Sequence, residues 1–126
     1  MDTDVARYEA GLGTMRTIFG PGAEAELKHL AEISPDLVRC LVEFPFGDIY
    51  ARPGLDLKTR EMLTVAALVV QGYPQAELHQ HVRGALNVGC TREEILEIIL
   101  QMAVYAGFPA ALEAVKTAAS AFGDRG

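Results

Sequence analysis

Apolar residues recur every three to four positions along most of the chain, as at Val5, Tyr8, Leu12, Met15 and Phe19. This spacing is that of an α-helix with one buried face. No region shows the sustained two-residue alternation, flanked by hairpin turns, that a half-buried strand requires. The pattern therefore predicts an all-α protein with about six to seven helices.

Glycine, proline and capping residues separate the predicted helices. The clearest boundary is at Thr91 and Glu94, because threonine followed three residues later by glutamate is a capping box. Pro45 is expected to kink or end the third helix, and the segment Phe46–Leu55 to form a turn or loop. The predicted helices cover about residues 5–19, 23–33, 35–44, 57–71, the stretch between Pro74 and Gly89, the stretch after Thr91, and 109–122.

Two of these helices are apolar on more than one face. The stretch Met62–Val70 is nearly continuous, and Ile95–Ala106 is interrupted chiefly by Glu97 and Gln101. A helix that is hydrophobic most of the way round must be covered on both sides. In a chain this short we expect another copy to supply part of the cover, which predicts a homo-oligomer. A compact monomer with a large core is the alternative.

Composition narrows the class of partner. The 126 residues fit a single domain, 1–126, and the net charge of −6 with an isoelectric point near 5.0 disfavours nucleic acid. No apolar run reaches the roughly 18 residues of a membrane span, and the N-terminus carries two acidic residues, Asp2 and Asp4, where a signal peptide is basic. We therefore expect a cytoplasmic protein with no membrane partner.

The two cysteines indicate no metal or dithiol site. Cys40 and Cys90 are far apart, and neither belongs to a CxxC or has a histidine at ligand spacing. Reduced thiols are the expected state.

The segment His79-Gln80-His81-Val82-Arg83 carries the candidate chemistry. Imidazole is the side chain that ordinarily changes charge between about pH 5 and 8. His79 and Arg83 are four residues apart and share a helix face, whereas His81 points elsewhere. Only one of the two histidines is therefore expected at the centre of a given pocket. The alternative is a surface or packed histidine.

Five segments, in this order and spacing, resemble the carboxymuconolactone decarboxylase family. They are Tyr8–Leu12, Gly47–Arg60, Glu77–Gly89, Thr91–Ile95 and Gln101–Ala111. The resemblance covers nearly the whole chain. It implies an alkylhydroperoxidase D-like helical subunit, a ring-like homo-oligomer (commonly a hexamer, otherwise a trimer), and no metal or organic cofactor.

The redox branch of this fold is disfavoured. That branch carries a CxxC on the turn before the histidine, together with a glutamate on the preceding helix. Here the corresponding turn, Gly72–Glu77, contains no cysteine, and Cys40 and Cys90 lie on other segments. A thiol peroxidase needs one thiolate to attack the peroxide and a second thiol to resolve the sulfenic acid. A dithiol reaction is therefore not expected.

The resemblance implies decarboxylation of gamma-carboxymuconolactone, or a related carboxylated lactone, to an enol-lactone in aromatic-compound catabolism, the beta-ketoadipate pathway. The lactone carbonyl accepts the electron pair left by carbon dioxide, so no cofactor is required. The enzyme must hold the anionic substrate, stabilise the dienolate oxyanion and deliver a proton to carbon. The alternatives are another small-molecule activity, isomerase or hydrolase, and a non-catalytic oligomeric binding protein.

By matching position, His81 is the expected proton donor or oxyanion partner. Arg83 and Arg60 are candidate carboxylate clamps, because a guanidinium group offers a bidentate fork. Arg52, on the loop before the fourth helix, is a candidate for the mouth of the site.

Three further residues are weaker candidates for substrate binding. The family pattern does not require a histidine at His79, and Tyr105 fits helix packing as well as a site. Glu61 is the most ambiguous, because an acid here serves the thiols in the redox branch, whereas the decarboxylase pattern usually has a small residue. If Glu61 lines the pocket, its carboxylate would repel an anionic substrate. The pattern also has an asparagine where this chain has Leu112, so a different substrate remains open.

Overall fold

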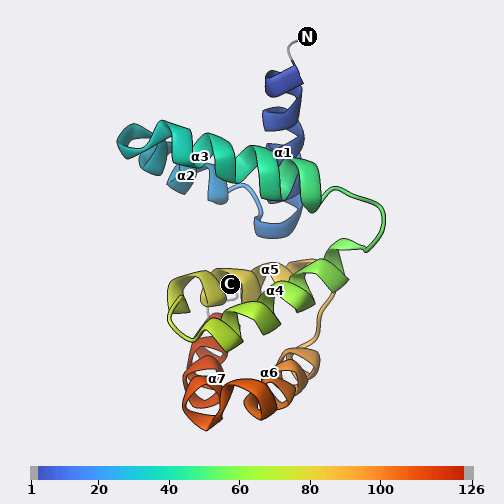
Figure 1. Ribbon diagram of the computed structural model, residues 1–126, viewed down its shortest axis with the longest axis vertical. Coiled ribbons are helices and arrows are strands. Elements are labelled where there is room, and N and C mark those ends of the chain that lie inside the picture. Colours follow the sequence, from blue (N-terminus) through green and yellow to red (C-terminus); the bar gives the residue numbers. More distant parts are fainter. Residues whose placement is uncertain (1–2, 124–126) are drawn as a thin grey trace. The chain divides into compact units, whose positions relative to one another are not determined.

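The structure is a computed structural model that describes residues 3–123. Within that range it contains helices and no strand (Figure 1), so the predicted all-α class is confirmed. In chain order the helices are α1 (Thr3–Phe19), α2 (Ala23–Ile33), α3 (Pro35–Leu41), the π-helix η1 (Val42–Ile49), α4 (Leu57–Gln71), α5 (Gln75–Asn87), α6 (Arg92–Ala106) and α7 (Phe108–Gly123). None of these helices is long and apolar enough to cross a membrane.

Contacts divide the chain into two units, with the boundary between Leu57 and Lys58. The first unit holds α1, α2, α3 and η1, and the second holds α4 to α7. The single domain expected from the chain length stays a prediction.

In the first unit, α1 packs closely against η1. Gly11 permits this approach, because a Cβ atom there would lie 2.0 Å from the carbonyl oxygen of Val42. Arg7 on α1 donates two hydrogen bonds, of 3.1 and 2.7 Å, to the carboxylate of Asp48 on η1. The two helices are thus held by a backbone contact at one end and a bidentate ion pair at the other.

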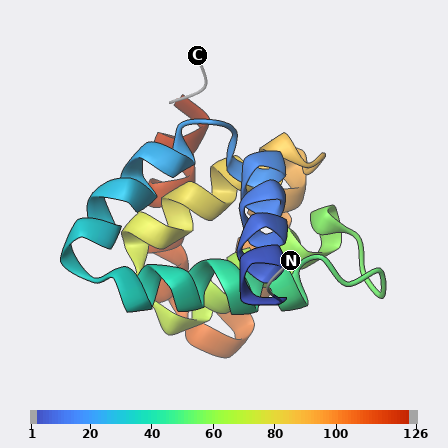
Figure 2. The ribbon, with the colours of Figure 1, turned by 90° about the horizontal axis from the view of Figure 1, so that it is seen from above.

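Pro45 does not end the third helix. α3 continues directly into η1 without a break in the helix (Figure 1, Figure 2). The helical stretch runs through Pro45 to Ile49. An α-helix excludes proline because its ring clashes with the carbonyl four residues back, and the wider π turn relieves that clash. The amide of Tyr50 donates to the carbonyl of Pro45, five residues earlier, at 2.7 Å. The predicted loop therefore begins at Tyr50 and not at Phe46.

In the second unit, α7 packs against both α5 and α6 through a row of small residues. The buried positions of α7 are Ala111, Ala114, Ala118 and Ala121. Larger side chains from the other three helices complete the core: Val65, Val69, Leu78, Val82, Ile95 and Ile99. The alanine spacing of three and four residues puts all four methyl groups on one face of α7, and this face lets the helices approach closely.

The predicted capping box at the start of α6 is confirmed. Thr91 Oγ1 accepts a hydrogen bond from the amide of Glu94 at 3.0 Å, and Glu94 Oε1 accepts one from the amide of Thr91 at 2.9 Å. Lys58 Nζ lies 3.1 Å from Glu94 Oε2. The hydrogen bond from the Thr91 amide, followed by the contact with Lys58, lowers the pKa of Glu94 from its ordinary 4.5.

Removing the cap should destabilise the second unit. We expect Thr91→Ala to lower the free energy of unfolding by about 1 kcal/mol, because the amide of Glu94 loses its acceptor. Urea denaturation followed by circular dichroism measures this. Thr17→Ala is the matched control, since that exposed hydroxyl only bonds back to the carbonyl of Gly13 within α1 and its loss should change stability by less than about 0.5 kcal/mol. Equal effects of the two variants would contradict the assignment.

The contribution of the Glu94 charge should depend on pH. A carboxyl group whose folded pKa is depressed stabilises the fold fully above the unfolded value and loses that contribution as the pH falls through the folded value. The free energy difference between the wild type and Glu94→Gln should therefore be constant above pH 4.5 and shrink below it. Urea titrations at a series of pH values measure this difference. A difference that grows toward acid pH would refute the assignment.

Candidate active site

A buried ion pair joins α4 and α5. Glu61 lies in the first turns of α4, His81 lies in the middle of α5, and His81 Nδ1 is 2.8 Å from Glu61 Oε1. The break between the two helices is at Gly72, whose φ of 79° favours glycine. α5 then begins at Gln75, and His81 follows almost two turns later.

The pair lies inside the apolar core of the second unit. Glu61 is 0% exposed and His81 is 8% exposed. Glu61 shares one face of α4 with Val65 and Val69, four and eight residues later, and both valines are buried. On α5, Leu78 and Val82 flank His81 and are fully buried.

The hydrogen bond to His81 uses only one of the two carboxylate oxygens of Glu61. Glu61 Oε2 is buried and has no hydrogen-bond partner among the described residues. A buried polar atom that forms no hydrogen bond costs about 1–3 kcal/mol, and more for a charged group.

The geometry fixes how the imidazole can act. With Glu61 ionised, Nδ1–H donates to Oε1, and any proton that the imidazole gives up or takes while this hydrogen bond persists belongs to Nε2. As an imidazolium, His81 donates a proton from Nε2. As neutral imidazole, it accepts one there. Both are general acid–base functions.

The two arginines predicted as carboxylate clamps lie on the same helices as this pair. Arg60 directly precedes Glu61 on α4 and is half-buried. Arg83 is exposed on α5, two residues beyond His81. Because residues two apart on a helix point to different faces, Arg83 and His81 do not share one.

His79 and Tyr105 lie at the surface of the second unit. His79 is half-buried and lines an open hollow between α5 and α7, together with Lys116 and Ser120. Tyr105 is 76% exposed near the end of α6. The role of these two residues in substrate binding stays a prediction.

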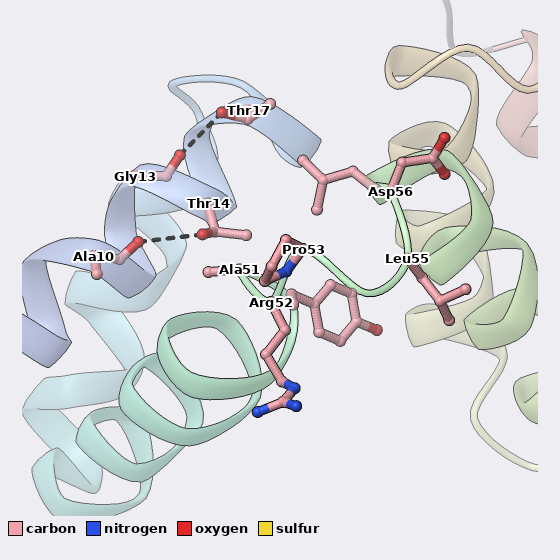
Figure 3. A pocket seen from close by; sticks show the side chains of 11 residues that line it. Ala10, Gly13, Thr14, Thr17, Ala51, Arg52, Pro53, Leu55 and Asp56 are labelled. Atoms are coloured by element: carbon pink, nitrogen blue, oxygen red, sulfur yellow. Dashed lines mark hydrogen bonds between the residues drawn. The ribbon is translucent and has the colours of Figure 1, made fainter.

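Arg52 lies in the first unit, beside an open hollow of about 590 Å³. One wall is the small-residue face of α1, with Ala10, Gly13, Thr14 and Thr17, and the other is the segment 50–57. Figure 3 shows the hydroxyls of Thr14 and Thr17 turned back to carbonyls of α1, and the Arg52 side chain extending away from Thr17. The hollow offers one guanidinium and the carboxylate of Asp56 as charged groups.

Sequence reasoning named both Glu61 and His81 but did not join them. Glu61 was predicted as an ambiguous candidate for substrate binding, and its carboxylate faces the imidazole in the core. The signal that would have found the pair is the spacing of Glu61, Val65 and Val69, which puts a carboxylate on the buried stripe of α4. A buried carboxylate requires a partner, and His81 on the next helix is one candidate.

Comparison with known proteins agrees with the sequence motifs. The family model described as carboxymuconolactone decarboxylase matches residues 35–120. The chain is 34% identical over 124 residues to 4-carboxymuconolactone decarboxylase of Acinetobacter baylyi, which covers 98% of this chain and 92% of that protein.

Two further relatives match most of the chain. It is 36% identical over 112 residues to an uncharacterised 15.0 kDa protein from the nqo9–nqo10 intergenic region of Paracoccus denitrificans, covering 87% of this chain and 84% of that protein. It is 33% identical over 109 residues to nitrosuccinic acid decarboxylase of Metarhizium robertsii, and this match covers 86% of this chain and 76% of that protein. Two relatives named as decarboxylases support an enzyme of the carboxy-lyase class. The family match and these likenesses show that the chain belongs to the carboxymuconolactone decarboxylase family.

Proposed function

We propose that this enzyme decarboxylates a small carboxylic acid that carries its own electron acceptor, and that His81 delivers the proton. The first candidate substrate is gamma-carboxymuconolactone or a related carboxylated lactone, converted to an enol-lactone in aromatic-compound catabolism. The observation that carries the proposal is the buried His81–Glu61 pair, 2.8 Å apart, in a chain whose named relatives are decarboxylases.

The chemistry needs few groups from the protein. The bond between the carboxylate and its carbon breaks, carbon dioxide leaves, and the electron pair moves through the double bond onto the lactone carbonyl oxygen. The Nε2–H bond of the His81 imidazolium then breaks as a new C–H bond forms. Solvent returns a proton to Nε2, so one proton is consumed in each turnover.

The names of the relatives fit this class of substrate. One is named for a carboxymuconolactone and the other for nitrosuccinic acid. A lactone carbonyl conjugated with a double bond and a nitro group are both strong electron acceptors. A carboxylate beside such a group loses carbon dioxide without an external electron sink. Arg60 and Arg83 remain our candidates for holding the anionic groups, because guanidinium binds carboxylate in a bidentate manner.

Replacing the imidazole should abolish turnover. We expect His81→Asn to lower kcat/KM by roughly 100-fold or more, the usual contribution of general acid–base catalysis. The assay follows the ultraviolet absorbance of the conjugated lactone together with carbon dioxide release. Asparagine retains an N–H that can face Glu61, and circular dichroism verifies that the variant is folded.

The matched control is His29→Asn, since His29 is exposed on α2 in the first unit. This variant should keep wild-type activity. A folded His81→Asn enzyme with wild-type turnover would remove His81 from the reaction.

We also propose that the enzyme is a homo-oligomer, with a hexamer or trimer as the assembly that the family resemblance implies. α6 buries Ile95 and Ile99 in the core of its own unit, yet an adjacent side of the helix is also apolar. Large side chains on that side and on the start of α7 are exposed: Leu96, Leu100, Val104, Phe108, Leu112 and Val115. An exposed apolar surface of this extent marks an interface, and a second copy covers it without any other partner.

A charge placed on this surface should disrupt the assembly. We expect Leu100→Glu to shift the protein to a smaller species in sedimentation-velocity experiments, because the carboxylate would be desolvated in the interface. Ala6→Glu is the control, an equally exposed helix position on α1. It should leave the sedimentation coefficient unchanged. A wild type that sediments as a monomer would refute the proposed assembly.

A further inference from the structure

A hollow of about 390 Å³ lies between α1 and α2 in the first unit. Its volume is within the range of small-molecule sites. Figure 2 shows the two helices diverging from the turn that joins them, and an ion pair between Arg16 and Glu24 links them near that turn. The lining residues extend from Glu24 away from the turn, along α1 to Tyr8 and along α2 to Ala31.

Most of the lining of this hollow is apolar. Tyr8 and Leu12 are four residues apart on α1 and share one face, and Leu27 and Ala31 do the same on α2. Leu27 is buried, and Leu12 and Ala31 are half-buried. Two of the lining residues of α2, Ala25 and Ala31, are small and leave room that larger side chains would fill. An apolar group placed here would leave water together with the surface that it covers, which favours its binding.

Two hydrogen-bond donors line the same hollow. They are the hydroxyl of Tyr8, which is half-buried, and the ammonium group of Lys28, which is exposed. Neither forms a hydrogen bond or an ion pair with another of the described residues. Glu24, the acidic residue of the lining, accepts a hydrogen bond from Arg16, so its charge is already balanced. The positive charge of Lys28 is therefore available to a ligand.

We propose that this hollow binds a small amphipathic carboxylate. The apolar tail lies against Leu12, Leu27 and Ala31, and the head group accepts hydrogen bonds from Tyr8 and Lys28. A carboxylate suits these two donors because it accepts through both of its oxygens. It is also a monoanion, which matches the single unbalanced positive charge of the lining. The site shares no lining residue with the His81–Glu61 pair, so the proposal goes beyond the proposed reaction and does not depend on it.

Octanoate is the probe for this site. Titrated into ¹⁵N-labelled protein, it should move the amide signals of α1 and α2 around the hollow, and isothermal titration calorimetry gives its Kd. Acetate has the charge without the tail and should bind at least roughly tenfold more weakly. Octan-1-ol has the tail without the charge and should bind at least roughly threefold more weakly.

Three variants test the two parts of the site. Lys28→Gln and Tyr8→Phe each remove one donor and keep most of the side-chain volume, and each should raise the Kd for octanoate by roughly three- to tenfold. Ala31→Leu leaves both donors in place and fills the hollow, so it should raise the Kd by at least roughly tenfold. Circular dichroism verifies that each variant is folded.

The matched control is Lys116→Gln. Lys116 is also a lysine beside a hollow, the one between α5 and α7, and it lies 3.4 Å from Glu113. This variant should bind octanoate as the wild type does.

Three results would overturn the proposal. The first is a wild type that gives neither heat nor signal shifts with octanoate. The second is an equal loss of affinity in Lys28→Gln and Lys116→Gln, which would mean that octanoate does not distinguish this hollow from the rest of the surface. The third is an Ala31→Leu variant that sediments as a smaller species while octanoate leaves the α1 and α2 signals of the wild type unmoved, because a second copy would then occupy the hollow.

Discussion

Burial of the Glu61 carboxylate beside the His81 imidazole is the constraint on which the second unit depends. Each group is polar and lies in a core of valine, leucine and alanine, where the two face each other at 2.8 Å. A shift of either helix by one residue would turn one member of the pair by about 100° and break this hydrogen bond. The pair therefore favours one register of α4 against α5.

Small residues set the remaining geometry, in different ways in the two units. In the first, the missing Cβ of Gly11 lets the backbone of η1 approach α1. In the second, the alanine face of α7 lets it pack against α5 and α6 together. α6, in contrast, carries large apolar residues both in the core and at the surface. Its buried isoleucines face the core while Leu100 and Val104 face outward, so one helix links folding to the proposed assembly.

Much of the helical architecture could be predicted from local chemistry. The bounds of α2 and α4 were predicted correctly, and the capping box at Thr91 was found in full, because these ends are set by residues adjacent in sequence. Pro45 was misjudged, since a proline ends an α-helix but fits the wider π turn, and no local pattern signals that change of hydrogen bonding. The Glu61–His81 contact joins residues 20 apart in sequence, and it could be predicted only after both buried faces were known.

The position of Glu61 also changes the electrostatic argument about substrate. From the sequence, a carboxylate at this position was expected to repel an anionic substrate if it lined the pocket. In the structure the Glu61 carboxylate is 0% exposed and faces the His81 imidazole at 2.8 Å. Under the proposed function, the attraction of an anionic substrate then falls to guanidinium groups such as Arg60, which neighbours the pair on α4. Binding and proton transfer would then depend on different residues, so a change of anionic group on the substrate could be accommodated without altering the proton donor.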